Sequence, residues 1–104
     1  MQIQLNTDNH LHGDARVQEV VERLVTQALG PVTARLSRVE VHLKDLNADK
    51  GGVDIRATLE ARPEGLRPFG AHHDDTGIEA AVRGAAKKMR ARLEHEFGKL
   101  ADKR

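Results

Sequence analysis

The sequence predicts an α+β fold, in which one domain with the element order β-α-β-β-β-α packs two helices on one face of a four-stranded sheet. Hydrophobic and polar residues alternate in several short segments, as in strands with one buried face. In two longer segments the hydrophobic residues recur every three or four positions, as on one side of a helix. The 104 residues suffice for one hydrophobic core and not for two. We therefore expect a single domain over residues 1–104, with a short charged tail from about residue 101 to 104.

The first strand and the first helix are predicted within residues 2–30. Ile3 and Leu5 alternate with polar neighbours, which indicates a short strand with a narrow apolar face. Asp14 is a suitable N-cap for the helix that follows, and Gly30-Pro31 is a strong stop signal. The helix is recognised by apolar side chains that fall on one stripe, namely Val17, Val20, Val21, Leu24, Val25, Ala28 and Leu29.

Three further strands follow, separated by turns rich in Gly, Pro and Asn at residues 47–52 and 63–65. They are predicted at residues 38–44, at residues 53–62 and, more briefly, around Phe69 and Ala71. The first two alternate without a break, so one face of each is expected to be buried. Pro68 has no N–H to donate, which favours an edge position for the last strand.

A long second helix is predicted from about residue 77 to about residue 100. Thr76 and Glu79 match the capping box, in which the two side chains bind amides left free at a helix start. Residues 72–75 are then expected to form the approach to this helix, where Asp74 and Asp75 suit the positive end of its dipole. Helical spacing is kept by Ile78, Ala81, Val82, Ala85, Met89, Leu93, Phe97 and Leu100.

The connections between these elements predict the topology of the sheet. A crossover through the first helix makes the first two strands parallel neighbours, joined in the right-handed sense. Short links make the second, third and fourth strands an antiparallel meander. Both helices then cover the same face of the sheet.

The charge of the chain is unevenly placed. The net charge is only +1, yet residues 79–104 hold eight Lys or Arg against four acidic residues, a net of +4, while residues 1–78 carry a net of −3. Helical geometry places the second-helix cations on two flanks of the apolar stripe. One flank carries Arg83, Lys87 and Arg90, and the other carries Lys88, Arg92 and Lys99.

A rigid helix with several cations toward solvent can neutralise phosphates without reading bases. Only two residues are aromatic, both Phe at core-phase positions, so we expect phosphate contacts and not base stacking. The alternative remains open that these cations only keep the helix surface hydrated and interact favourably with the negative, C-terminal end of its dipole. On the first helix, Arg16 and Arg23 are expected to matter less, because Asp14, Glu19 and Glu22 share that helix and offset their field.

Several kinds of site are not expected. The chain has no Cys, hence no disulfide, thiolate ligand or Cys nucleophile. Its histidines, His10, His12, His42, His72, His73 and His95, lack the i, i+4 pair of zinc hydrolases. There is no phosphate-binding Gly loop, and Ser37 is the only serine. We expect no catalytic residue, metal, cofactor or small-molecule substrate, and the protein is not expected to be an enzyme.

The N-terminal residues and the hydropathy of the chain indicate where in the cell the protein is expected. The first five residues show no secretory signal, and nowhere do about 18 apolar residues run together. We therefore expect a cytoplasmic protein without a membrane partner.

Five stretches of sequence carry a resemblance to a known family. They are the opening strand (1–7), the alternating strand at 38–43, the His-His-Asp-Asp stretch at 71–75, and the helical stretches at 78–82 and 86–93. In this element order they resemble the ribosome hibernation promoting factors, also called ribosome-associated translation inhibitors or sigma-factor modulation proteins. Thr76-Gly77 departs from the pattern, because many members carry an aromatic residue there.

The resemblance implies a bacterial protein of stress or stationary phase that inhibits translation. Such a protein occupies the messenger and transfer RNA channel of the small ribosomal subunit. The family's basic second-helix positions correspond here to the candidate RNA-binding residues Arg83, Lys87, Lys88, Arg90 and Arg92. The chain looks like the short type, which acts with a second factor when ribosomes dimerise. The alternative is a protein-interaction module that modulates a transcription factor without RNA.

Overall fold

The predicted element order is found in the structure, a computed structural model that describes residues 1–8, 11, 13–47 and 54–102. A 3-10 helix, η1, joins the expected elements. In chain order the elements are β1 (Gln2–Thr7), α1 (Ala15–Leu29), η1 (Gly30–Arg35), β2 (Leu36–Asp45), β3 (Ile55–Pro63), β4 (Phe69–Asp75) and α2 (Ile78–Asp102). Most of the turn expected at 47–52, the start of the third strand at Val53 and the last two residues of the tail lie outside the described residues.

The four strands form one mixed sheet in the order β1-β2-β3-β4. β1 runs parallel to β2, with Ile3 beside Val39, and the β2–β3 and β3–β4 pairs are antiparallel. β4 therefore lies at an edge, as Pro68 indicated. The predicted topology is confirmed.

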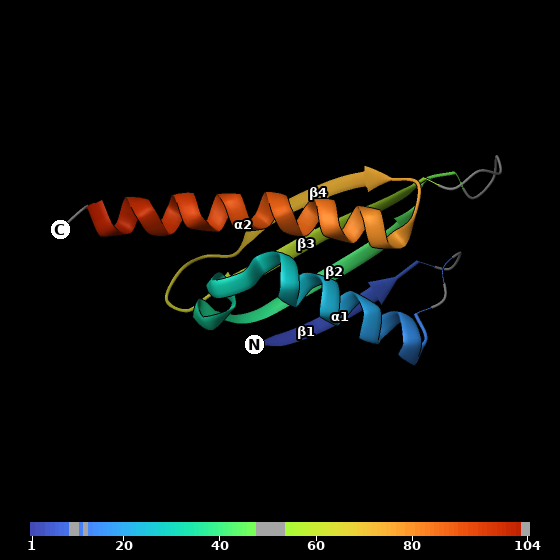
Figure 1. The fold of residues 1–104 in the computed structure, drawn as a ribbon, viewed down its shortest axis with the longest axis horizontal. Helices are drawn as coiled ribbons and strands as arrows, with labels where there is room; N and C mark the ends of the chain where they lie inside the picture. Colours follow the sequence, from blue (N-terminus) through green and yellow to red (C-terminus); the bar gives the residue numbers. More distant parts are fainter. Residues whose placement is uncertain (9–10, 12, 48–53, 103–104) are drawn as a thin grey trace.

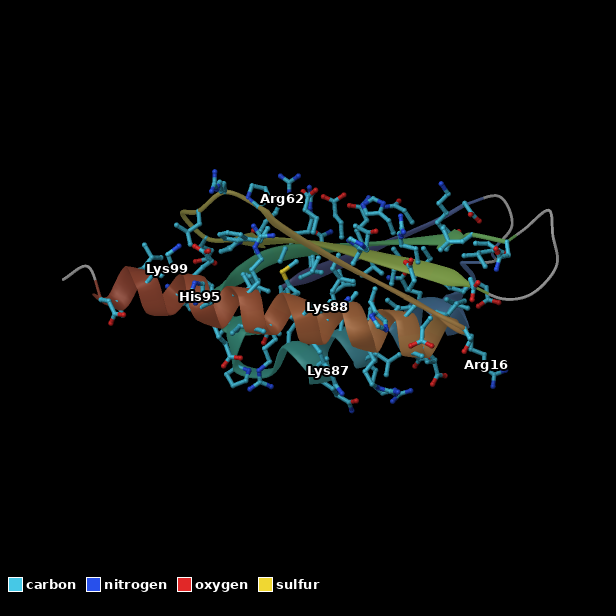
Figure 2. The ribbon with its side chains drawn as sticks, turned by 90° about the horizontal axis from the view of Figure 1, so that it is seen from above. Arg16, Arg62, Lys87, Lys88, His95 and Lys99 are labelled. Atoms are coloured by element: carbon cyan, nitrogen blue, oxygen red, sulfur yellow. The ribbon has the colours of Figure 1, made fainter. Side chains whose placement is uncertain are left out.

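Both helices cover the same face of the sheet, as predicted (Figures 1 and 2). The alternation of the strands turns one set of side chains toward the helices and the other toward solvent. The core between the layers is filled mainly by aliphatic side chains and Met89, and the largest of those fully buried are Leu29, Ile55, Leu59, Met89 and Leu93. The last turns of α2 extend past the sheet (Figure 1).

Asp14 caps α1, as the sequence predicts. Its carboxylate accepts a hydrogen bond from the backbone N–H of Val17 at 3.0 Å. At the other end Gly30 has a φ of 59°, a conformation that favours glycine. The chain then continues as η1 instead of leaving the helical region. Proline at the second position of η1 is compatible with such a turn because the first N–H groups of a helix have no acceptor within the helix.

Replacing Asp14 with Ala is expected to lower the free energy of unfolding by about 1 kcal/mol, because an orphan amide of the first turn loses its acceptor. Chemical denaturation checks this value. Asp14→Asn keeps a capping oxygen and should stay close to the wild type. Equal losses in both variants would show that the charge of Asp14, and not its capping oxygen, stabilises the helix.

One predicted boundary and one predicted cap are wrong. β4 is longer than expected, because the stretch from His72 to Asp75 pairs with β3, with Asp75 opposite Ile55. Helix α2 begins at Ile78, and the carbonyl of Gly77 accepts its first bond, from Ala81 N–H at 3.0 Å. Gly77 thus occupies the cap position that the capping box assigned to Thr76. Strand pairing with β3 holds the approach segment extended, which a local pattern cannot reveal.

Candidate nucleic-acid interface

The five predicted RNA-binding residues lie around the part of α2 that faces away from the core. In the sequence they lie between the buried residues of this helix, which include Val82, Met89 and Leu93. Lys87 projects away from the sheet, and Lys88 lies closer to β4 (Figure 2). We call the solvent side of α1 and α2 the helix face. Its α2 cations are Arg83, Lys87, Lys88, Arg90 and Arg92.

Two of these cations reach across to the edge strand. The Nζ of Lys88 donates to the carbonyl oxygen of His72 at 3.1 Å, and Nη1 of Arg92 donates to that of Gly70 at 2.8 Å. The Arg92 guanidinium also lies over the Phe69 ring, 5.0 Å from its centroid. Carbonyls and a ring are neutral partners. Both side chains are therefore held in place while their positive charge stays uncompensated.

The other cations differ in how far they are neutralised. The Nε of Arg90 lies 3.2 Å from Oε1 of Glu94, one helical turn further on. Arg83 and Lys87 are exposed and form no hydrogen bond or ion pair within the described residues. Only Arg90 among the five is thus paired with a carboxylate there.

The opposite surface is electrostatically different. We call it the sheet face: the solvent side of the sheet, formed by the strand residues that alternate with the buried ones. There Arg62 lies 3.5 Å from Glu40 and 3.0 Å from Glu60, Arg38 lies 3.0 Å from Glu40, and Arg56 lies 2.8 Å from Asp74. Arg62 points away from the helices (Figure 2). Most charges of this face therefore cancel locally, whereas four of the five α2 cations have no carboxylate partner among the described residues.

The Arg56–Asp74 pair has a measurable electrostatic signature. Two hydrogen bonds from the guanidinium, at 2.8 and 3.0 Å, hold the pKa of Asp74 below its usual value. The pKa of Asp75 is also lowered, first by the backbone N–H of Thr76 and then by the His73 ring. Both carboxylates are stabilised in the ionised form. Neither is suited to hold a proton near neutral pH for acid–base catalysis.

The depressed pKa of Asp74 predicts how stability depends on pH. Because the folded pKa lies below the unfolded one, the contribution is fully present above the unfolded value and is lost as pH falls through the folded value. An NMR titration of the Asp74 carboxyl carbon should give a midpoint below that of an ordinary Asp. Arg56→Gln should raise that midpoint. An identical midpoint in the variant would show that Arg56 does not hold the ionised form.

The histidines do not form a metal centre in the part of the chain that the structure describes. No group of three or more His, Cys, Asp or Glu side chains there could hold a metal ion. His73 instead places Nε2 3.1 Å from Oδ2 of Asp75 and lies against Gly84 of α2. His10 and His12 lie outside the described residues. Within the described ranges, neither helix has the length and apolar character to cross a membrane.

No family model matches the chain, and no curated protein matches it. Solved structures do share its fold. A ribosomal subunit interface protein from Coxiella burnetii superposes with a TM-score of 0.78 at 12% identity, over 94% of this chain and 99% of that one. The N-terminal domain of Protein Y from Thermus thermophilus gives a TM-score of 0.71 at 16% identity, over 91% and 98%. The fold that the resemblance implied is confirmed.

Proposed function

We propose that this protein binds the bacterial ribosome in the cytoplasm and inhibits translation without acting as an enzyme. The basic surface of α2 contacts ribosomal RNA of the small subunit, in the channel that messenger and transfer RNA use. One observation carries the proposal: of the five α2 cations on the helix face, Arg90 alone pairs with a carboxylate among the described residues. The fold shared with a ribosomal subunit interface protein supports the same partner.

The proposed mechanism is steric occlusion held by phosphate contacts. Cations on a rigid helix release counterions from an RNA backbone and need no particular base sequence. Both Phe side chains are buried, so stacking on bases contributes nothing. A protein lodged in the channel excludes messenger and transfer RNA and keeps idle ribosomes from initiating, in stress or stationary phase. A second factor joins it where ribosomes dimerise.

Co-sedimentation of the purified protein with purified small subunits tests this function. At low salt the protein should move with the subunits, and excess messenger and initiator transfer RNA should release it. A protein that stays at the top of the gradient at low salt would overturn the proposal. Release only by salt, and not by the competing RNAs, would place the binding site outside the channel.

A second experiment separates the RNA partner from a protein partner. Nuclease treatment of a cell extract should release the protein from its complex if ribosomal RNA holds it. A complex that survives nuclease would favour the protein-interaction module that modulates a transcription factor.

A further inference from the structure

Strand β1 lies at the edge of the sheet opposite β4. Among the described strands it pairs with β2 only, so one side of its backbone faces outward (Figure 1). Asp8, directly after the strand, donates its backbone N–H to the carbonyl oxygen of Leu43 at 3.2 Å. In a parallel pair, alternate residues direct their backbone groups to the neighbouring strand. The even-numbered residues of β1 therefore bond to β2, and the outward groups belong to Ile3, Leu5 and Thr7.

These outward backbone groups are unpaired. Within residues 1–8, 11, 13–47 and 54–102, no backbone hydrogen bond outside the β1–β2 pair involves these three residues. Edge strands are commonly blocked by a lysine, a proline or a bulge. β1 has neither a charged residue nor a proline from Gln2 to Thr7, and its register with β2 is regular over that range. β1 therefore offers a template for another extended chain.

The apolar side chains of β1 are incompletely covered. Ile3 and Leu5 pack against the core, yet both are only half-buried. A strand added to β1 would place its own side chains beside them, on the same face of the sheet. Apolar side chains on the helix side of that strand would remove more of their surface from water. The occupant is thus expected to be a strand with a partly apolar face.

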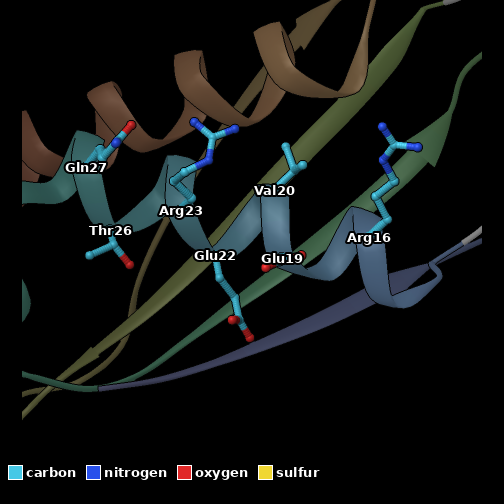
Figure 3. A pocket seen from close by; sticks show the side chains of 7 residues that line it. All are labelled: Arg16, Glu19, Val20, Glu22, Arg23, Thr26 and Gln27. Atoms are coloured by element: carbon cyan, nitrogen blue, oxygen red, sulfur yellow. The ribbon is translucent and has the colours of Figure 1, made fainter.

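A carboxylate on α1 indicates the charge of the occupant. A hollow beside the start of β1 is lined by Ile3, by Glu22 and Thr26 of α1, and by Thr33 of η1. Glu22 is exposed and points toward β1, away from α2 (Figure 3). Within the described residues its carboxylate accepts a hydrogen bond from the neutral side-chain amide of Gln18 at 2.9 Å and forms no ion pair. The hollow therefore carries uncompensated negative charge.

The nearby cations do not neutralise this carboxylate. Arg16 and Arg23 line a neighbouring hollow to which Glu22 also contributes. Both guanidinium groups are turned toward α2, whereas the carboxylate is turned toward β1 (Figure 3). Met1 borders the hollow beside β1, but in the described part of the chain its ammonium group forms no ion pair. A cation projected from an added strand would therefore find this carboxylate unpaired.

We propose that β1 accepts an extended, basic segment of a partner protein, which pairs with the outer side of the strand and places a lysine or arginine beside Glu22. The inference goes beyond the proposed function, because this surface requires no RNA. Main-chain hydrogen bonds supply affinity in this mode of binding, and the side chains that alternate toward the hollow supply preference.

The charge of Glu22 favours a basic partner over a second copy of this chain. Two β1 strands that paired with their apolar faces on the same side would bring two Glu22 carboxylates to one side of the joined sheet. Like charges brought together in this way destabilise the pairing, whereas a lysine in that place stabilises it.

A peptide titration followed by NMR tests the proposal. The probe is a short peptide in which threonine alternates with valine or lysine, so that valine and lysine share one face. Hydrogen exchange of each backbone amide is measured in the full-length protein as the peptide is added. Exchange should slow at Ile3, Leu5 and Thr7, and change little at Gln4 and Asn6, which already bond to β2. Peptide binding without slower exchange at the outward amides would overturn the proposal.

Two variants with the same charge change test the role of the carboxylate. Glu22→Gln should weaken binding of the lysine peptide by up to about fivefold, the range for one exposed ion pair. Glu79→Gln removes a carboxylate from the first turn of α2 and should leave the affinity unchanged. A peptide with glutamate in place of lysine should bind the wild type more weakly. Equal effects of the two variants would mean that only net charge matters and would overturn the proposed basic partner.

Sedimentation of the free protein distinguishes the two occupants. The protein should remain a monomer as its concentration is raised. A concentration-dependent dimer with the same outward amides protected would assign the edge to a second copy and overturn the proposal. Because the peptide titration contains no ribosome, its result is independent of whether the protein binds small subunits.

Discussion

Replacing Lys87 and Lys88 with Ala is expected to weaken binding to small ribosomal subunits and to flatten its salt dependence by about 1 to 2 units of slope. Each phosphate contact contributes roughly −0.7 to −0.9 to the slope of log affinity against log salt. About four contacts by the α2 cations would give the wild-type protein a slope near −3 from that helix. Two missing contacts therefore remove about half of it.

Titration of labelled protein onto small ribosomal subunits at several salt concentrations measures this effect. Thermal melting is the control for folding. Stability should change little, because Ala favours helix and both side chains are exposed. The bond from Lys88 to the His72 carbonyl is lost, which affects only the edge of the sheet. Lys99→Ala is a useful comparison, since Lys99 lies 3.7 Å from Glu96 and its charge is already offset. An unchanged slope in a folded Lys87/Lys88 variant would identify these lysines as ordinary solvated charges.

Replacing Gly84 with Ala is expected to destabilise the packing of α2 on β4. A Cβ at this position would lie 2.2 Å from Cδ2 of His73 and 2.5 Å from its Cγ. The ring cannot move aside without breaking its contact with Asp75, 3.1 Å away. Overpacking of this kind costs about 1 to 3 kcal/mol. Ala is favoured over Gly within a helix by about 1 kcal/mol, so the net loss should reach up to about 2 kcal/mol.

Chemical denaturation of Gly84→Ala, His73→Ala and the double variant measures the coupling between these positions. Removing the ring in the Gly84→Ala background should recover stability, so the double variant should be more stable than the sum of the single changes predicts. Additive losses would mean that the His73 ring is not what the new methyl group meets.

Much of the fold could be predicted because each element carries its own pattern. Alternation about Val41 and Leu59, the helical stripes and the cap at Asp14 are local signals that the tertiary structure reinforces. What could not be predicted depends on contacts distant in sequence. The extension of β4 to Asp75 comes from pairing with β3, and η1 follows a glycine that the sequence indicates only as a stop.

The candidate site could be predicted in outline for the same reason. A helix of regular period determines which cations flank the buried stripe, so the two flanks of α2 follow from sequence spacing. Which cations are neutralised does not follow from spacing. Arg92 finds a carbonyl of β4 and not a carboxylate, and Glu22 binds Gln18 instead of an arginine. Which partner each charged side chain finds depends on the positions of side chains in the packed tertiary structure.

The contacts of Lys88 and Arg92 with β4 also bear on self-association. An edge strand presents unpaired backbone groups to any other extended chain, which is a common route to aggregation. Here the carbonyls of Gly70 and His72 are already occupied by charged donors from α2. A strand from a second molecule would have to displace both side chains from these carbonyls before it could pair there. The β4 edge of the sheet is therefore protected against strand addition by residues of the same helix that we propose for RNA binding.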